Sequence, residues 1–327
     1  MPKQPGKTGE KTCDWMKIEF FAPIEMIDAL NNFMEELGAQ GAFQETLEPL
    51  SSFGKDPIKN APALAPPSGE ILKAFLPFDV HLEQRLAALQ IYIDSLTELF
   101  PELEKPGFRT EIIRDPDWGE AWKKYFKPLR VSRNIIIKPT WESFSPVGRE
   151  IVIEIDPGMA FGTGQHPSTR MCLEAIDKLL LSEQLTEQWS ILDVGTGTGI
   201  LGIACAKLGA RRVLCVDNDE QATEIAQENV LINRVEERVT VTSRDVAELT
   251  EPFDLVVANL TAKILIEFYP DLVRLVKPGG YLVISGIIEQ NKPDIETRFL
   301  SDSFPIHHLI TEKEWVCYLL KKAGEHP

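Results

Sequence analysis

The segment 190–201 constrains the fold of this chain most strongly, because it has the features of a buried strand that turns through three glycines into a helix. Its sequence is SILDVGTGTGIL, with Gly195, Gly197 and Gly199 at alternate positions. Glycine adopts positive φ angles and lets a ligand approach the backbone closely. The first N–H groups of the following helix are free to bind a polar ligand. This order predicts an adenosine-binding crevice at the carboxyl end of the strand.

After residue 190, short apolar runs alternate with helical segments, which is typical of a largely parallel, doubly wound α/β sheet. Two late runs, Ile306–Thr311 and Glu314–Leu320, are separated by two residues and permit an antiparallel hairpin at the sheet edge. We therefore expect a Rossmann-like sheet with an antiparallel edge strand. Its other strands are predicted at Ser190–Val194, Arg212–Val216, Val239–Thr242, Leu255–Ala258 and Tyr281–Ser285.

Two carboxylates beside the glycine loop indicate which ligand it binds. Asp217 ends the second strand, 22 residues after Gly195, where a carboxylate can accept hydrogen bonds from both ribose hydroxyls. Asp193 would sit badly beside a pyrophosphate, but it suits the cationic amine or sulfonium of S-adenosylmethionine. The dinucleotide fingerprint would also need a glycine at position 200, which is isoleucine here. These residues favour a class I S-adenosylmethionine-dependent methyltransferase over a nicotinamide enzyme, with Asp193, Gly195, Gly197 and Asp217 as cofactor-binding residues.

Polar residues after the later strands are further candidates. Asn259 follows the fourth strand, and its side chain offers both a donor and an acceptor. We predict that it binds the cofactor and helps to align the incoming amine, although an Asn here could also cap the next helix. Asp245, after the third strand, either accepts a hydrogen bond from the adenine amino group or is an ordinary loop residue.

The segment Asp156–Thr169 (DPGMAFGTGQHPST) is predicted to form a shaped loop that leads into a helix. A hydroxyl at Ser168 or Thr169 can reach a ligand carboxylate or cap the helix. Phe161 is a second candidate for the surface that aligns the acceptor. His166 could act as a base, but methyl transfer from a sulfonium does not require a strong one.

The first third of the chain is expected to form a separate α+β domain, residues 1–114, ahead of a methyltransferase domain at 115–327. Its periodicities alternate in the order βαββαβ, which is the ferredoxin-like arrangement. It offers no catalytic cluster, so we expect it to recognise the substrate. Three smaller segments are also predicted: a disordered tail at 1–14, a Pro-rich loop insertion at 49–69, and an aromatic linker helix near 115–128.

Composition limits the partners. The net charge of −16 disfavours nucleic-acid binding; such a surface can steer a basic protein partner, but charge alone is better explained by solubility. The five cysteines are scattered without a C-x-x-C pair, so neither a metal site nor disulfides are expected. No run approaches the roughly 18 apolar residues of a membrane span, and the polar N-terminus does not look like a signal peptide. We expect a cytoplasmic monomer.

Beyond these derivations, the chain resembles the bacterial ribosomal protein L-eleven methyltransferases over most of its length. The resemblance is carried by DWGEAWKKYFKPLR at 117–130, the 156–169 loop, the glycine loop, VANLTA at 257–262 and EKEW at 312–315. It implies a ferredoxin-like domain that recognises the ribosomal protein, and cofactor contacts at Thr169, Gly195, Asp217 and Asn259. The Pro-rich 49–69 segment matches no signature of that family.

The resemblance implies methylation of lysine side chains and of the N-terminal amine of the ribosomal protein. Two alternatives remain at this point. One is a lysine methyltransferase that acts on a different protein. The other is a non-catalytic regulator that binds adenosine-type ligands, although its site would be expected to be broken.

Overall fold

A computed structural model describes residues 15–37, 39, 42–45, 70–113, 127–156, 164, 166–182, 188–301 and 304–324. The chain divides into two compact units, Met1–Tyr125 and Phe126–Pro327, here called the first and second units. The predicted tail at 1–14, the insertion at 49–69 and nearly all of the linker helix near 115–128 lie outside the described residues.

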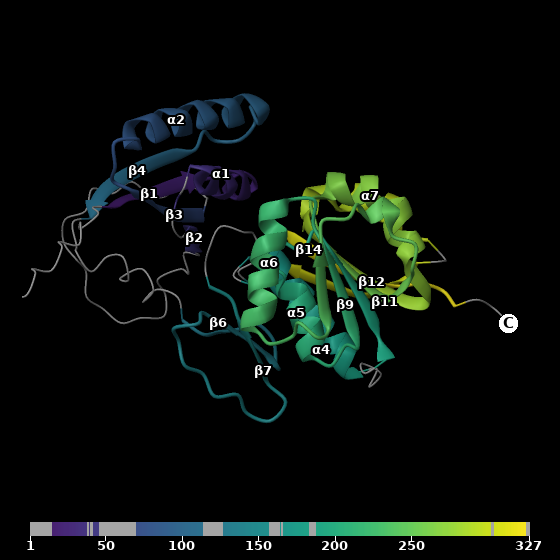
Figure 1. Cartoon of the computed structure of the whole chain (residues 1–327). Coiled ribbons are helices and arrows are strands. Elements are labelled where there is room, and N and C mark those ends of the chain that lie inside the picture. The colour runs from purple at the N-terminus through teal and green to yellow at the C-terminus, as the bar shows by residue number, and fades with distance from the viewer. Residues whose placement is uncertain are drawn as a thin grey trace, which may run out of the picture. The chain divides into compact units, whose positions relative to one another are not determined.

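Over its described residues, the first unit is a four-stranded antiparallel sheet with two helices (Figure 1). Its sheet order is β2-β3-β1-β4, and β1 pairs along its length with both β3 and β4. Alternate β1 residues, among them Ile18 and Phe20, are buried against apolar side chains of both helices. The elements are β1 (Trp15–Ala22), α1 (Ile24–Glu36), β2 (Ala42–Glu45), β3 (Glu70–Pro77), α2 (Leu82–Leu99) and β4 (Gly107–Ile113).

The second unit is built on a seven-stranded sheet in the order β10-β9-β8-β11-β12-β14-β13. The first five are mutually parallel, and β14 runs antiparallel to both β12 and β13. This confirms the predicted doubly wound sheet and its antiparallel edge. The strands are β8 (Ser190–Val194), β9 (Arg212–Val216), β10 (Val239–Thr242), β11 (Phe253–Asn259), β12 (Val276–Ile288), β13 (Ile306–Glu312) and β14 (Trp315–Lys321).

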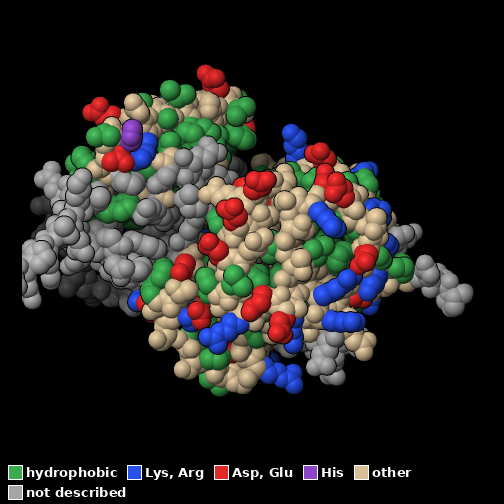
Figure 2. Space-filling view, viewed as in Figure 1, with side chains coloured by type: hydrophobic (Ala, Val, Ile, Leu, Met, Phe, Trp, Pro, Cys, Tyr) green, Lys and Arg blue, Asp and Glu red, His purple; other side chains and the backbone are tan. Residues whose placement is uncertain are grey.

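Helices cover both faces of this sheet (Figure 1). One face packs on α4 (Pro167–Ser182), α5 (Ile200–Lys207) and α6 (Glu220–Ile232), and the other on α7 (Ala262–Leu275) and α8 (Lys292–Phe299). All five residues of β8 are buried, as expected for a central parallel strand covered on both faces. On the face seen in Figure 2, acidic and basic side chains are interspersed over this unit.

β12 is longer than predicted. It runs from Val276 to Ile288, although the apolar pattern gives only Tyr281–Ser285. The extra residues include Gly279 and Gly286, which indicate strand ends in a sequence but here have positive φ angles inside the strand. The register against β14 shifts between Ile284 and Ile287, so Gly286 lies in an irregularity that the strand continues past.

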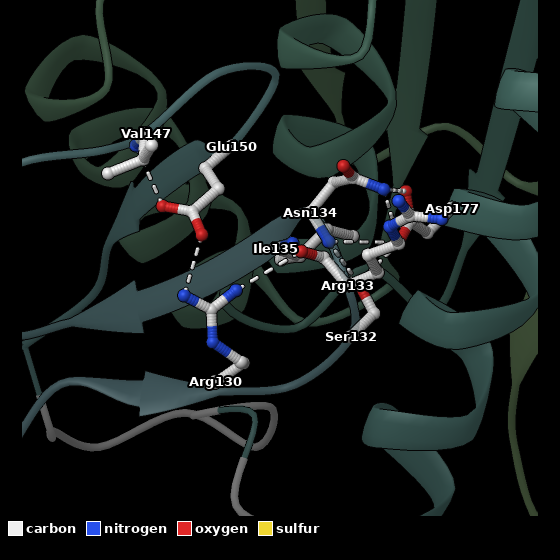
Figure 3. A network of polar contacts seen from close by, with 8 residues as sticks. All are labelled: Arg130, Ser132, Arg133, Asn134, Ile135, Val147, Glu150 and Asp177. Atoms are coloured by element: carbon white, nitrogen blue, oxygen red, sulfur yellow. Dashed lines mark hydrogen bonds and ion pairs between the residues drawn. The ribbon is translucent and has the colours of Figure 1, made fainter.

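A small three-stranded sheet precedes α4, with the order β5 (Leu129–Arg130), β6 (Ile135–Lys138) and β7 (Ile151–Glu154). Asp177 of α4 ties it to the main body: this buried carboxylate accepts hydrogen bonds from Ser132 Oγ at 2.6 Å and Asn134 Nδ2 at 3.1 Å (Figure 3). Arg130 is bonded to Glu150 at 2.6 Å in the same view. The sheet is therefore held by buried polar contacts rather than by strand pairing alone.

Candidate cofactor and acceptor site

The glycine loop has the backbone that its sequence predicts. Gly195, Gly197 and Gly199 have φ angles of 68°, 53° and 80°, in the left-handed region that other residues adopt at a cost. The N–H of Gly195 donates to the carbonyl of Val216 at 2.9 Å, which ties the loop to the end of β9. Helix α5 starts after Gly199 without a side-chain cap. In the first turn of this helix, the N–H of Gly202 donates to the carboxylate of Asp193, as the N–H groups at a helix start need partners outside the helix.

Space at Gly195 is limited by a residue that sequence reasoning missed. A Cβ atom on Gly195 would lie 2.4 Å from Cδ2 of Leu260, the residue after Asn259. The N–H of Leu260 donates to the carbonyl of Ser285 at 3.1 Å, which fixes this residue to β12. A Cβ atom on Gly286 would in turn lie 2.5 Å from the Leu260 carbonyl oxygen. The sequence signal for this contact was Gly286, because a lone glycine inside an apolar strand often marks a close backbone approach.

Asp193 lies beneath the loop and is almost fully buried. Its Oδ2 accepts hydrogen bonds from Thr196 Oγ1 at 2.6 Å and from the N–H of Gly202 at 3.0 Å. Its Oδ1 is buried and accepts no hydrogen bond within the described part of the chain. Burial raises the pKa of this carboxyl to about 6, against the hydrogen bonds from Thr196 and Gly202 that lower it. A cation placed against Oδ1 would relieve the cost of this buried charge.

Asp217 lies at the carboxyl end of β9, next to the loop. Its Oδ2 accepts a hydrogen bond from the N–H of Gly197 at 2.9 Å, and its Oδ1 accepts one from the N–H of Asp219 at 3.1 Å. Each carboxylate oxygen has a second acceptor position. The half-buried side chain can therefore hold the loop and still accept from ribose hydroxyls.

Thr169 and Asn259 meet although they are 90 residues apart. Asn259 Nδ2 lies 3.3 Å from Oγ1 of Thr169, a buried residue in the first turn of α4. The Oδ1 of Asn259 is buried and has no hydrogen-bond partner among the residues that the structure describes. The pair therefore presents an unused amide acceptor beside a hydroxyl at the carboxyl end of β11.

His166 and Asp245 have local structural partners, and Phe161 lies outside the described residues. His166 Nδ1 lies 2.7 Å from Ser168 Oγ and accepts from the Ser168 N–H at 3.2 Å, as a helix cap would. Burial, with a contribution from the positive charge of Arg170, lowers the pKa of His166 to about 3. Asp245 accepts from the Ala247 N–H at 2.9 Å and so caps a short 3-10 helix at 246–248. Neither contact requires a ligand.

The residues fit the S-adenosylmethionine predicted from the sequence. The positive-φ glycines leave the backbone open, and the Asp217 carboxylate lies beside them. Two orphaned buried oxygens, on Asp193 and Asn259, lie at the ends of the neighbouring strands β8 and β11. They are the acceptors that a ligand ammonium or hydroxyl would satisfy. Within the described residues there is no group of three or more potential metal ligands, and no helix is long and apolar enough to cross a membrane.

The site gives a first prediction at Asp217. Asp217→Ala should weaken S-adenosylhomocysteine binding by roughly 1.5–3 kcal/mol, because the ribose loses a charged acceptor and the Gly197 N–H loses its partner. Titration calorimetry measures the loss. The matched control is Asp219→Ala, which removes the cap of α6 and should cost about 1 kcal/mol of stability with little change in affinity. Equal affinity in wild type and a folded Asp217→Ala protein would refute the ribose assignment.

A second prediction concerns Asp193. Because its pKa is raised, the folded protein holds this proton more tightly than the unfolded chain, so the carboxyl's contribution to stability is present below pH 4 and lost as pH rises through about 6. A ligand ammonium prefers the ionised form. S-adenosylhomocysteine affinity should therefore rise with pH below about 6, by up to about tenfold per unit, and level off near pH 7. Asp193→Asn should flatten this profile, and an unchanged profile would contradict the assignment.

Comparisons with known proteins identify one family over nearly the whole chain. The family model described as Ribosomal protein L11 methyltransferase (PrmA) matches residues 14–323. The chain is 38% identical over 311 residues to a ribosomal protein L11 methyltransferase of Geobacter metallireducens, covering 95% of this chain and 99% of that protein. It is equally identical over 315 residues to that of Heliobacterium modesticaldum, covering 95% and 98%. A crystal structure of a ribosomal protein L11 methylase from Lactobacillus delbrueckii subsp. bulgaricus is 31% identical, with a TM-score of 0.54, and covers 61% of this chain and all of that one.

Proposed function

Because the chain belongs to the ribosomal protein L11 methyltransferase family and is an S-adenosylmethionine-dependent methyltransferase, we propose that it methylates amino groups of ribosomal protein L11. The acceptors are lysine side chains, the N-terminal amine, or both. The observation that carries the proposal is the convergence of the glycine loop, Asp217 and the Thr169–Asn259 pair at the carboxyl ends of neighbouring strands.

Each residue of the site has a role in this proposal. Asp217 holds the nucleoside beside the positive-φ backbone of the loop, and Asp193 faces the cationic amino-acid end. Thr169 and Asn259 bind the remaining polar groups, and Asn259 also orients the acceptor nitrogen through its free Oδ1. S-adenosylmethionine, when bound, supplies an electrophilic methyl group on a sulfonium. Phe161 stays a candidate for the acceptor surface.

The acceptor must be a neutral amine. A lysine amine has a pKa near 10.4, so only about one in 2,500 is neutral at pH 7, and removing the proton costs roughly 4–5 kcal/mol. Holding two reactants at attack distance can offset several kcal/mol of this cost. The pKa of His166 is too low for an effective base, and its Nδ1 faces the helix terminus. We therefore assign deprotonation to solvent and alignment to the protein.

We further propose that the first unit is a ferredoxin-like domain that recognises the ribosomal protein. The element order βαββαβ and the antiparallel sheet order β2-β3-β1-β4 support this assignment. The domain boundaries proposed are those expected from the sequence, 1–114 and 115–327. The net charge of −16 suits a basic protein partner and disfavours direct binding of nucleic acid. The proposal also includes a cytoplasmic location and a monomeric state.

The test uses the full chain, methyl-labelled S-adenosylmethionine and the L11 protein encoded by the same genome. The expected result is label on L11, mapped by mass spectrometry to lysine or N-terminal amines. The same reaction with all large-subunit proteins shows whether L11 is preferred. Label on another protein would move the activity to a different lysine acceptor, and label on arginine, glutamine or nucleic acid would overturn the substrate class.

A further inference from the structure

Two buried asparagines, Asn229 in α6 and Asn233 at the C-cap of this helix, connect the glycine loop to a distant strand. Asn229 and Asn233 are 6% and 5% exposed, and they are one helical turn apart. Buried amides of this kind must be fully hydrogen-bonded to be tolerated. Each makes side-chain hydrogen bonds to backbone groups outside α6.

Asn229 holds the glycine loop. Its Nδ2 donates to the carbonyl oxygen of Thr198 at 2.9 Å, in the peptide that leads into Gly199. The loop packs on the same face of α6, since a Cβ atom on Gly199 would lie 3.3 Å from Cβ of Ala226. The left-handed turn that opens α5 is therefore fixed at its carbonyl by a side chain from α6.

Asn233 anchors this arrangement to β7. Its Oδ1 accepts from the N–H of Glu154 at 2.8 Å, and its Nδ2 donates to the Glu154 carbonyl at 2.7 Å. The next residue, Ile155, donates its N–H to Lys138 of β6, so the peptide groups of Glu154 point to the opposite edge of the strand. The side-chain amide pairs with them as a neighbouring strand would.

The two asparagines are linked to each other. Asn233 Nδ2 also donates to the carbonyl of Asn229 at 2.9 Å, which closes a continuous path from Glu154 through both residues to Thr198. The Glu154 end of this path leads directly to Asp156, whose carboxylate accepts from the N–H of Thr140 at 2.6 Å. The strand at this end is held from both sides.

We propose that Asn229 and Asn233 are positioning residues for cofactor binding: they hold the Thr198–Gly199 turn in its ligand-binding conformation, with the Glu154 backbone as anchor. This rests on the proposed function, because the ligand of the loop is S-adenosylmethionine. Both asparagines are buried, so neither is exposed to a protein acceptor. The pair therefore acts on cofactor affinity and leaves recognition of the protein substrate unchanged.

The test compares Asn229→Ala with Asn134→Ala in the full-length protein. Asn134 is a matched control, because it is a buried asparagine that donates to Asp177, away from the glycine loop (Figure 3). Asn229→Ala should raise the dissociation constant of S-adenosylhomocysteine and the KM for S-adenosylmethionine by about tenfold, which corresponds to one lost buried hydrogen bond. The KM for the protein acceptor should stay within twofold, and Asn134→Ala should leave both cofactor constants within twofold.

The second variant tests the path. Asn233→Ala should raise the cofactor dissociation constant less than Asn229→Ala does, and the double variant should resemble Asn229→Ala because the two effects share one path. A folded Asn229→Ala protein with unchanged cofactor affinity overturns the proposal. So does insolubility of both variants while Asn134→Ala is soluble, because the pair would then serve folding. Failure of the wild-type protein to bind the cofactor would instead refute the proposed function.

Discussion

Gly286→Ala is expected to lower the free energy of unfolding by about 2–5 kcal/mol and to remove most of the cofactor affinity. The residue has a φ angle of 82°, which costs a non-glycine residue roughly 1–2 kcal/mol. The new methyl group would also lie 2.5, 2.9 and 3.1 Å from the O, C and N atoms of Leu260, and overpacking of this kind costs about 1–3 kcal/mol. Because Leu260 packs against Gly195, the strain reaches the glycine loop.

Gly279→Ala is the matched control for this prediction. Gly279 lies in the same strand and has a φ angle of 76°, but a Cβ atom there would meet nothing within 4 Å. The Gly279→Ala protein should therefore lose only the stability that a positive φ angle costs a non-glycine residue, about 1–2 kcal/mol. It should keep its affinity for S-adenosylhomocysteine. Urea denaturation and calorimetry on both variants measure the two quantities. Equal destabilisation in both would show that contact with Leu260 is unimportant.

The central sheet could be predicted from the sequence because its signals are local. β8, β9 and β10 have the predicted bounds: β8 and β9 are short, mostly apolar runs, and β10 is a run of β-branched Val and Thr. A parallel strand that is covered on both faces is apolar at successive positions, and this produces a short apolar run in the sequence. The glycine loop could be predicted for the same reason: its three positive φ angles follow from three glycines within five residues.

The contacts that complete the site could not be predicted in this way, because they join residues far apart in the chain. Nothing near Thr169 in the sequence indicates that its hydroxyl meets Asn259. The pairing of Asn233 with the backbone of Glu154 likewise spans 79 residues. The sequence allowed Asp245 either to bind the adenine amino group or to be an ordinary loop residue. Its contact with the Ala247 N–H is one that the loop role alone explains. Tertiary packing decides which polar residues near a ligand site face the ligand and which close a helix end.

The rate of methyl transfer to lysine is expected to rise about tenfold per pH unit between pH 6.5 and 8 at saturating S-adenosylmethionine. His166, the histidine just before α4, has a pKa lowered to about 3 and accepts from the Ser168 N–H. Transfer of a lysine proton to such a weak base is unfavourable by about seven pKa units. The rate should therefore follow the fraction of neutral amine in solution. Single-turnover rates on L11 measure this slope directly.

The His166→Asn variant tests whether His166 acts as a general base or only caps the helix. Asparagine can still accept from the Ser168 N–H, so this variant should keep both the stability and the pH slope of the wild-type protein. His166→Ala should lose about 1 kcal/mol of stability and keep the slope. If the wild-type rate instead levels off near pH 7 and this plateau is absent in His166→Asn, His166 is a general base and the assignment of deprotonation to solvent is wrong.

The same profile distinguishes the two kinds of acceptor amine. An N-terminal amine has a pKa of about 7.7–8.0 and a lysine amine one of about 10.4. If solvent removes the proton, transfer to the N-terminus should level off near pH 8, while transfer to lysine continues to rise to the limit of protein stability. L11 with a blocked N-terminus isolates the lysine reaction, and quantifying each methylated peptide separates the two rates in unblocked protein. A common plateau for both acceptors would mean that a group on the enzyme, or a step after deprotonation, sets the rate.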